Sequence, residues 1–377
     1  MSSDKFIPVN TPAFLGNEKK YLSECIDTGW VSSEGPFVEK FEHLFSAKVN
    51  KKYGIAVSNG SVAIDAAIES LNLKPGDEII LPAFTIISCI AQIVRSGIIP
   101  VLVDSDPKTL NMNVTEIESK ITSNTKAIMV VHIYGLPVDM DSISAIVNKH
   151  KLILIEDAAE MHGQTFKGLP CGSFGDISTF SFYSNKHITT GEGGMILTNS
   201  QEYAESCKSL RNLCFEIDNR FVHKRLGWNL RMTNLQAAVG VAQIERLDEI
   251  VIKKRYIGKK YNQLLKNLPM VTLPLEKIEG AENIYWVYSL ILDENFPFDA
   301  KFVISYLQEK GIGSRPFFCP MHMQPILKSK NLFINQSFPV AESLYMRGFY
   351  IPSGLGLTDS DLERVAEVLW GFFNGFS

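Results

Sequence analysis

The chain has 377 residues, of which 45% are hydrophobic and 21% are charged, and its formal net charge is −4. This length and composition are typical of a soluble globular protein with more than one core. The acidic balance excludes a general nucleic-acid binder, which is normally basic. Residues 1–19 hold no signal-peptide core and no later apolar run reaches membrane-spanning length, which predicts a cytoplasmic protein without a membrane partner. The 6 cysteines are scattered without metal-site spacing, so we expect free thiols and no metal.

The first half of the chain alternates short apolar runs with segments of helical periodicity. An irregular arm and two helices come first, over residues 5–17, 18–27 and 38–47. A strand at 53–57 and the turn Ser58-Asn59-Gly60 then lead into a helix that Ser61 would cap, and such a helix start suits an anion. Next come predicted strands at 78–81, 100–103, 127–132 and 152–155, and helices at 86–96, 114–121 and 140–150. Because the strands at 128–131 and 152–155 lack polar alternation, we predict a mostly parallel sheet covered on both faces, in an α/β fold.

Four residues lie just past these strands, where ligands bind in open α/β sheets. They are Asn59, Phe84, His132 and Asp157. Asp157 is therefore a candidate site residue, and its other interpretation is an ordinary loop or cap aspartate. Phe84 could equally be a core residue.

Lys186 is the candidate for covalent chemistry. It lies between an apolar strand at 179–182 and the run Gly191-Glu192-Gly193-Gly194, which a second strand at 195–198 follows at once. A loop lysine held between two strands can form a Schiff base with an aldehyde cofactor if its neighbours lower its pKa. The alternative is a solvated loop lysine.

The second half of the chain changes character. A helix at 202–210 and a polar, irregular stretch at 212–228 precede a long helix that begins after Thr233 and runs past Lys260. Beyond residue 268 the pattern is α+β, with a strand at 284–292, a helix at 301–310, an aromatic loop at 315–322 and a closing helix at 362–373. We therefore predict a large domain over residues 1–250 and a smaller α+β domain over residues 251–377.

Taken together, these motifs resemble the DegT/DnrJ/StrS family of sugar aminotransferases. The resemblance covers nearly the whole chain and implies a pyridoxal 5′-phosphate enzyme of fold type I, the aspartate aminotransferase fold. The segments that carry it are Gly16-Asn17-Glu18, Val57-Ser58-Asn59-Gly60, Val131-His132-Ile133-Tyr134-Gly135, Glu156-Asp157-Ala158-Ala159-Glu160, the Lys186 loop and Asn229-Leu230-Arg231-Met232-Thr233.

The resemblance implies roles for individual residues. Lys186 would bind the cofactor covalently and then move the proton between cofactor and substrate. Asp157 would pair with the ring nitrogen, Phe84 would stack on the ring, and Glu160 would lie near its phenolic oxygen or the sugar.

Other residues would hold the phosphate of the cofactor. Gly60, Ser61 and Ser181 would bind it within one subunit, and Asn229 would reach the phosphate in the other subunit. The resemblance therefore implies a homodimer whose active sites are shared.

The implied reaction moves the amino group of L-glutamate, through pyridoxamine 5′-phosphate, to C4 of a nucleotide-linked 4-keto-6-deoxyhexose. Segments 181–186 and 315–318 most resemble the members that make GDP-perosamine for polysaccharides such as the O-antigen of lipopolysaccharide. A dTDP- or UDP-linked sugar, or amination at C3, is the alternative. Arg231, Arg315 and the basic run near Arg220 are candidates for the diphosphate, and His322 for the sugar.

Three further classes compete with this interpretation. A related sugar dehydratase carries histidine in place of the lysine, but here Lys186 occupies that position and His187 only follows it, as a loop residue. A cofactor-binding regulator without turnover would be expected to lose some of Lys186, Asp157 and Asn229, and all three are present. A nicotinamide oxidoreductase would need G-x-G-x-x-G after the first strand, where Ser58-Asn59-Gly60-Ser61 stands.

Overall fold

The computed structural model describes residues 6–216 and 218–376. Its main feature is a seven-stranded sheet of order β1-β9-β8-β5-β4-β2-β3. Only β9 runs against its neighbours, so the other six strands end at the same edge. The strands are β1 (Tyr53–Val57), β2 (Glu78–Pro82), β3 (Ile99–Val103), β4 (Thr125–Val131), β5 (Ile153–Asp157), β8 (Ile177–Ser181) and β9 (Gly194–Thr198). The predicted mostly parallel α/β sheet is confirmed.

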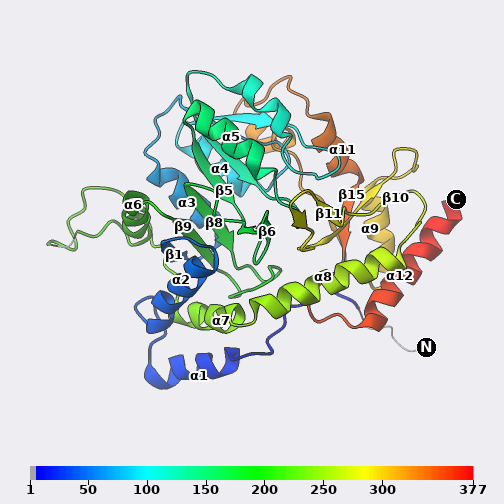
Figure 1. The fold of residues 1–377 in the computed structure, drawn as a ribbon, viewed down its shortest axis with the longest axis horizontal. Coiled ribbons are helices and arrows are strands. Elements are labelled where there is room, and N and C mark those ends of the chain that lie inside the picture. Colours follow the sequence, from blue (N-terminus) through cyan, green and yellow to red (C-terminus); the bar gives the residue numbers. More distant parts are fainter. Residues whose placement is uncertain (1–5, 217, 377) are drawn as a thin grey trace.

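Helices cover both faces of this sheet, as its apolar strands require (Figure 1). One face packs against α3 (Gly60–Ser70), α4 (Ser88–Arg95) and α6 (Gln201–Arg211). The other packs against α2 (Pro36–Lys48), α5 (Met140–His150) and α7 (Asn234–Ile244), and α1 (Glu18–Thr28) lies against α7.

A second, antiparallel sheet lies in the C-terminal part, in the order β10-β13-β15-β14. Its strands are β10 (Val271–Thr272), β13 (Tyr288–Leu292), β14 (Arg315–Pro316) and β15 (Gly348–Ile351), and its helices are α9 (Ala300–Glu309), α10 (Pro325–Lys328), α11 (Pro339–Arg347) and α12 (Asp359–Phe373). Two ribbons, β6 (Thr165–Phe166) with β7 (Leu169–Pro170) and β11 (Lys277–Ile278) with β12 (Ala281–Glu282), complete the strands.

Helix α8 (Leu247–Leu264) runs along both parts of the molecule (Figure 1). Its first turns belong to the core of the large sheet through Leu247, Ile250 and Val251. Its later turns belong to the C-terminal core through Ile257 and Tyr261. The predicted division near residue 250 falls within this helix and stays a prediction.

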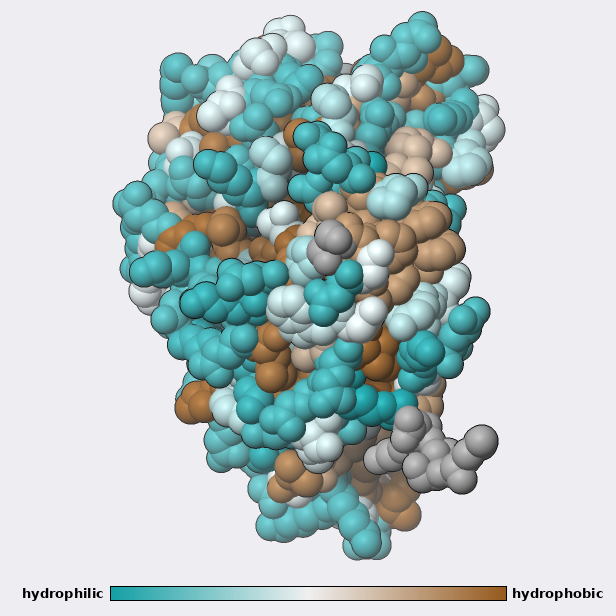
Figure 2. All heavy atoms as spheres, turned by 90° about the vertical axis from the view of Figure 1, so that its right-hand side faces the viewer, coloured by the Kyte–Doolittle hydropathy of each residue, from teal (hydrophilic) through white to brown (hydrophobic). Residues whose placement is uncertain are grey.

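The C-terminal part carries an apolar patch on its surface. Figure 2 shows a mostly hydrophilic face with apolar side chains gathered near its middle. Phe298 and Phe302 stack at 4.1 Å between ring centroids and are 36% and 45% exposed.

No helix of residues 6–216 and 218–376 is both long and apolar enough to cross a membrane, and these residues contain no metal-binding cluster.

Two predicted helices differ in the structure. The segment predicted as a helix at 114–121 forms two short 3-10 turns, η1 (Val114–Glu116) and η2 (Glu118–Lys120), whose backbone hydrogen bonds join residues three positions apart. Further 3-10 turns are η3 (Met321–Met323) and η4 (Asn374–Phe376). The helix predicted as continuous after Thr233 breaks between α7 and α8.

Two predicted boundaries also differ. Helix α3 begins at Gly60, not after Ser61, because the Asn59 side chain accepts a hydrogen bond from the Val62 N–H at 3.0 Å and caps it. The strand predicted from residue 284 begins at Tyr288, since Tyr285 has a φ of 49°, which an extended strand cannot contain.

Gly258 in α8 tests how closely this helix packs. A Cβ at this position would overlap the buried ring of Tyr285. We expect Gly258→Ala to lower the free energy of unfolding by about 1–3 kcal/mol, although alanine is the better helix former. Urea unfolding measures this change.

Gly371 is the matched control, since it lies in α12 and a Cβ there would meet nothing within 4 Å. Gly371→Ala should raise the free energy of unfolding by about 0.5–1 kcal/mol. An equal gain at both positions would contradict the packing of α8 on Tyr285.

Candidate active site

The Lys186 loop is anchored at the rim of the sheet where the parallel strands end. Phe182 donates its N–H to the Gly193 carbonyl at 2.8 Å, and Thr190 donates its N–H to the Phe182 carbonyl at 3.0 Å. Lys186 closes a turn by donating its N–H to the Tyr183 carbonyl at 2.9 Å. These backbone bonds hold the loop and direct the lysine toward the end of β5.

The Lys186 side chain is only 10% exposed, which contradicts a solvated loop lysine. Its Nζ lies 4.0 Å from Glu160 Oε1 and 3.8 Å from the ring centroid of Trp286. Burial lowers the pKa of the Lys186 amine, and Glu160 and Asp157 oppose that effect. A lysine whose pKa is lowered is a better nucleophile toward a carbonyl carbon.

Asp157 is the last residue of β5 and is 2% exposed. Its Oδ1 accepts a hydrogen bond from the Ala159 N–H at 3.0 Å, while its Oδ2 accepts one from the Cys89 thiol at 3.3 Å. Burial raises the pKa of this carboxyl group. An oxygen whose protein partner is only a thiol suits a further, positively charged N–H donor.

Glu160 is the second carboxyl group of the cluster. Its Oε2 accepts a hydrogen bond from the Tyr134 N–H at 2.7 Å. Burial raises the pKa of Glu160 to about 8, although Lys186 and the Tyr134 N–H act against this shift. Glu160 can therefore hold a proton at neutral pH, which makes it suited to proton transfer.

The start of α3 forms a cradle at the other side of the site. A Cβ on Gly60 would lie 2.6 Å from Ser181 Cβ, so only glycine lets the helix approach the end of β8 this closely. The Ser61 and Ser88 hydroxyls are 2.7 Å apart beside it. Backbone N–H groups at a helix N-terminus together with hydroxyls bind phosphate.

The wall of the site is aromatic. Phe84 is fully buried, with its ring centroid 6.0 Å from that of Tyr134 and 5.9 Å from that of Phe317. The ring centroid of Trp286 lies 5.9 Å from that of Tyr134, and Trp286 is the aromatic residue that contacts Lys186. Such a wall excludes water and suits a planar ring.

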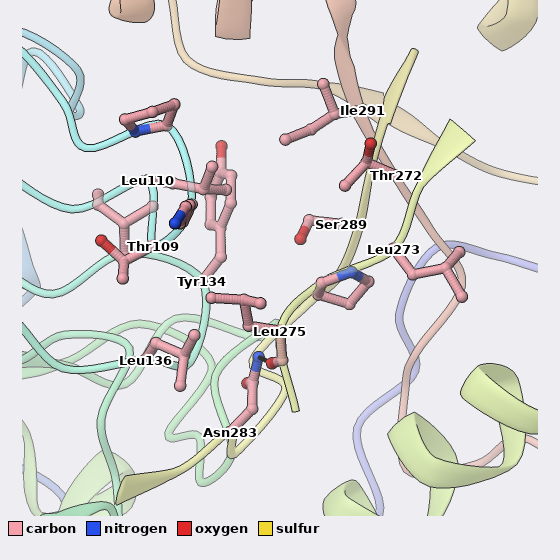
Figure 3. Close-up of a pocket in the computed structure, with 14 residues that line it drawn as sticks. Thr109, Leu110, Tyr134, Leu136, Thr272, Leu273, Leu275, Asn283, Ser289 and Ile291 are labelled. Carbon is pink, nitrogen blue, oxygen red and sulfur yellow. Dashed lines mark hydrogen bonds between the residues drawn. The ribbon is translucent and has the colours of Figure 1, made fainter. Parts of the chain in front are cut away.

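Tyr134 also borders a cavity of about 150 Å³ between the two parts of the chain. In Figure 3, Tyr134 stands between Thr109 and Leu110 on one side and Ser289 and Ile291 on the other. The cavity is mostly apolar, and its polar groups include the hydroxyls of Thr109 and Ser289.

Asn229 and Arg231 lie outside this cluster. Both belong to the segment after the irregular stretch, and Asn229 is exposed. Arg231 donates from Nε to Asn229 Oδ1 at 2.9 Å. The carbonyl of Leu230, the residue between them, accepts a hydrogen bond from the Ser58 N–H at 2.8 Å. The backbone of residues 229–231 therefore runs next to the segment that leads into α3.

Arg315 and His322, the remaining predicted site residues, have different surroundings. Arg315 is exposed. Burial and the nearby Glu160 raise the pKa of Tyr350, and the positive charge of Arg315 acts against this shift. The His322 ring packs on Phe338, and its Nε2 lies 3.0 Å from Glu342 Oε1. These contacts of His322 are with α11 and the segment before it, and not with Lys186.

His187 is more than a loop residue. It is 2% exposed, and its Nε2 lies 3.2 Å from the Ile284 carbonyl oxygen. Burial lowers the pKa of His187 well below its usual range, so the ring is neutral. It joins the lysine loop to the C-terminal part.

Sequence reasoning did not identify Cys89, Tyr134 or Trp286 as site residues. The signal for Tyr134 was present, since it follows His132 at the end of β4. Trp286 and Cys89 come from segments whose position relative to Lys186 only the folded chain reveals.

These residues fit pyridoxal phosphate. A buried amine faces two carboxyl groups, Asp157 has an oxygen suited to a pyridinium N–H, and the glycine and serine cradle suits a phosphate. With the parallel sheet, they define a pyridoxal-phosphate-dependent aminotransferase of fold type I.

Comparison with known proteins agrees with this class. The model of the DegT/DnrJ/EryC1/StrS aminotransferase family matches residues 14–370, and the chain belongs to that family. It is 40% identical over 98% of its length to a GDP-perosamine synthase of Vibrio cholerae, covering 99% of that protein. It is also 40% identical over 98% of its length to a GDP-perosamine synthase of Caulobacter vibrioides, again covering 99%.

A solved structure extends the comparison. It is a GDP-4-keto-6-deoxymannose-3-dehydratase variant with bound GDP-perosamine. The match has a TM-score of 0.87 and 25% identity, and it covers 96% of this chain and 100% of the other.

Glu160 gives a pH dependence of stability that can be measured on the cofactor-free chain. Its pKa is raised from 4.5 to about 8 in the folded protein. The stabilisation linked to its proton is complete below the unfolded pKa and is lost as pH rises through the folded pKa. We therefore expect the free energy of unfolding to fall less steeply between pH 4.5 and about pH 8 in Glu160→Gln than in the native chain. Urea unfolding at a series of pH values measures these slopes.

Glu309→Gln, at the exposed end of α9, is the control and should leave the slope unchanged. Equal slopes for native chain and Glu160→Gln would show that Glu160 is ionised in the folded protein.

Proposed function

We propose that this enzyme transfers the amino group of L-glutamate to C4 of GDP-4-keto-6-deoxymannose and so forms GDP-perosamine. The observation that carries this proposal is the buried Lys186 amine facing Glu160 and Asp157. The choice of sugar is supported by 38–40% identity to GDP-perosamine synthases of three bacteria over 98% of the chain.

When bound, pyridoxal phosphate supplies a carbonyl carbon that exchanges amines and a ring that accepts electron density. Lys186 would hold it covalently and, once released, would carry a proton on Nζ between the cofactor and the substrate carbon. Asp157 would keep the ring nitrogen protonated, and Glu160 would hold a proton near the phenolic oxygen or the sugar. Phe84 would cover one face of the ring, and Gly60, Ser61 and Ser181 would bind the phosphate.

Amination is favoured over sugar dehydration by Lys186 itself. A lysine amine can attack a carbonyl carbon and move protons, and the adjacent His187 ring is turned into the core toward Ile284. Since the lysine, Asp157 and the phosphate cradle are all present, a regulator without turnover is not favoured.

We further propose a cytoplasmic homodimer that shares its active sites and supplies polysaccharide synthesis, such as that of the O-antigen. Asn229 is exposed and lies outside the Lys186 cluster of its own subunit, so it suits a contact with the phosphate in the other subunit. Apolar side chains near α1 and in the projecting stretch before Asn229 suit a partner surface. They include Phe14, Leu15, Ile26, Phe221 and Leu226, which are 53–91% exposed. Arg231, Arg315 and the run near Arg220 remain candidates for the diphosphate.

The choice of nucleotide can be tested by amination assays. GDP-, dTDP- and UDP-linked 4-keto-6-deoxy sugars are offered separately with excess L-glutamate, and the aminosugar is identified by mass spectrometry and NMR. We expect product from the GDP sugar, aminated at C4, and a loss of at least about 10³-fold in rate for Lys186→Ala. Turnover of a dTDP or UDP sugar alone would overturn the perosamine assignment and leave the aminotransferase assignment in place.

Sharing of sites between subunits can be tested by mixing two inactive variants. Lys186→Ala removes the amine, and Asn229→Asp places a negative charge where the partner's phosphate would lie. If the sites are shared, an equal mixture that has exchanged subunits should recover about a quarter of the native activity, because half of the dimers then carry one intact site. No recovery after verified exchange would place both residues in the same site of one subunit.

A further inference from the structure

The indole of Trp286 forms the nearest aromatic surface to the Lys186 amine. Nζ lies 3.8 Å from its ring centroid, closer than the 4.0 Å that separates Nζ from the nearest Glu160 oxygen. Trp286 is 4% exposed, and its Nε1 donates to the Asn185 carbonyl at 3.0 Å. The indole therefore contacts both the amine of Lys186 and the backbone of the residue before it.

The segment that carries Trp286 is held in a strained conformation. Tyr285 has a φ of 49°, and the Asn283 side chain accepts its N–H at 2.7 Å. The backbone is also pressed against Gly135, where a Cβ would lie 2.7 Å from Tyr285 N and 3.1 Å from Trp286 N. Bulky residues adopt this backbone region only where the surrounding structure imposes it.

A buried lysine holds the same segment from behind. Lys254 in α8 is 3% exposed, and its Nζ donates to the Trp286 carbonyl at 2.9 Å and to the Ser353 carbonyl at 2.6 Å. Burial lowers the pKa of Lys254 to about 7. A lysine buried at this cost without a carboxylate partner in the described part of the chain needs those carbonyl groups, and its position fixes theirs.

We infer that Trp286 is a further active-site residue, which holds the free Lys186 amine on its indole face, and that Lys254 is the residue that positions Trp286. Assigning Lys186 a part in turnover rests on the proposed function. The contact itself does not depend on which sugar the enzyme uses.

The physical effect of the indole is on the charge of the amine. Several groups face Lys186: the carboxyl groups of Glu160 and Asp157, the Cys89 thiol and the rings of His162 and His187. Both histidines are neutral because burial lowers their pKa, for His162 to about 3. The indole face stabilises the ammonium form against the burial that destabilises it. It thereby favours a proton on Lys186 whenever the amine is not bonded to the cofactor.

The test measures the titration of Lys186 in the cofactor-free full chain. Trace acetylation at a series of pH values, followed by mass spectrometry of the Lys186 peptide, gives its midpoint, with the exposed Lys266 as internal standard. We expect Trp286→Leu to lower the midpoint by about 0.5–1.5 pH units and Trp286→Phe to lower it less, because indole is the stronger of the two rings for a cation. A midpoint that rises or stays in Trp286→Leu would show that the indole only excludes water and would overturn the inference.

Lys254 is tested by a double-mutant cycle, which cancels the direct effect of its own charge. The shift caused by Trp286→Leu is measured again in a Lys254→Met background, with thermal unfolding to verify that each variant is folded. If Lys254 positions the indole, the shift should fall to less than about half of its size in the native background. A full shift would overturn the role of Lys254, and because the readout is a midpoint rather than turnover, neither result depends on the proposed substrate.

Discussion

The active site depends on keeping one lysine amine, that of Lys186, out of water at the rim of a parallel sheet. A buried lysine is costly, and Lys186 is tolerated because two carboxyl groups and an aromatic ring surround its amine. The burial that makes this position costly also lowers the pKa of the Lys186 amine and so makes the amine more reactive. Stability and reactivity at this position are therefore opposed, and the rest of the sheet and its loops must offset the cost of burying the amine.

The two carboxyl groups near the lysine are separated by their environments. Asp157 sits at the end of a strand with a backbone N–H on one oxygen and a thiol on the other. Glu160 accepts a backbone N–H from Tyr134, and burial raises its pKa to about 8. Two acids a few residues apart thus suit different tasks: Asp157 has an oxygen suited to a positively charged N–H donor, and Glu160 is suited to exchanging protons.

The C-terminal part completes the site. It supplies Trp286, Phe317 and Tyr350 to the aromatic wall, and α8 contributes to the cores of both parts. Family membership and the buried lysine agree on an aminotransferase. The relatives at 38–40% identity point to a GDP-linked sugar, which the geometry of the lysine does not address.

The sequence by itself determined the α/β sheet, the family and the edge at which the site lies, because apolar periodicity and the order of strands are local properties. It also indicated Lys186 from its place between two strands and Asp157 from the end of a strand, and the family resemblance added Glu160 and Gly60. Only the tertiary structure decided that Trp286 lies on the Lys186 amine and that Lys254 lies behind it. Those contacts join residues about 100 and 32 positions apart, and the segment that carries Trp286 has a positive φ at Tyr285, for which no local pattern gives a signal.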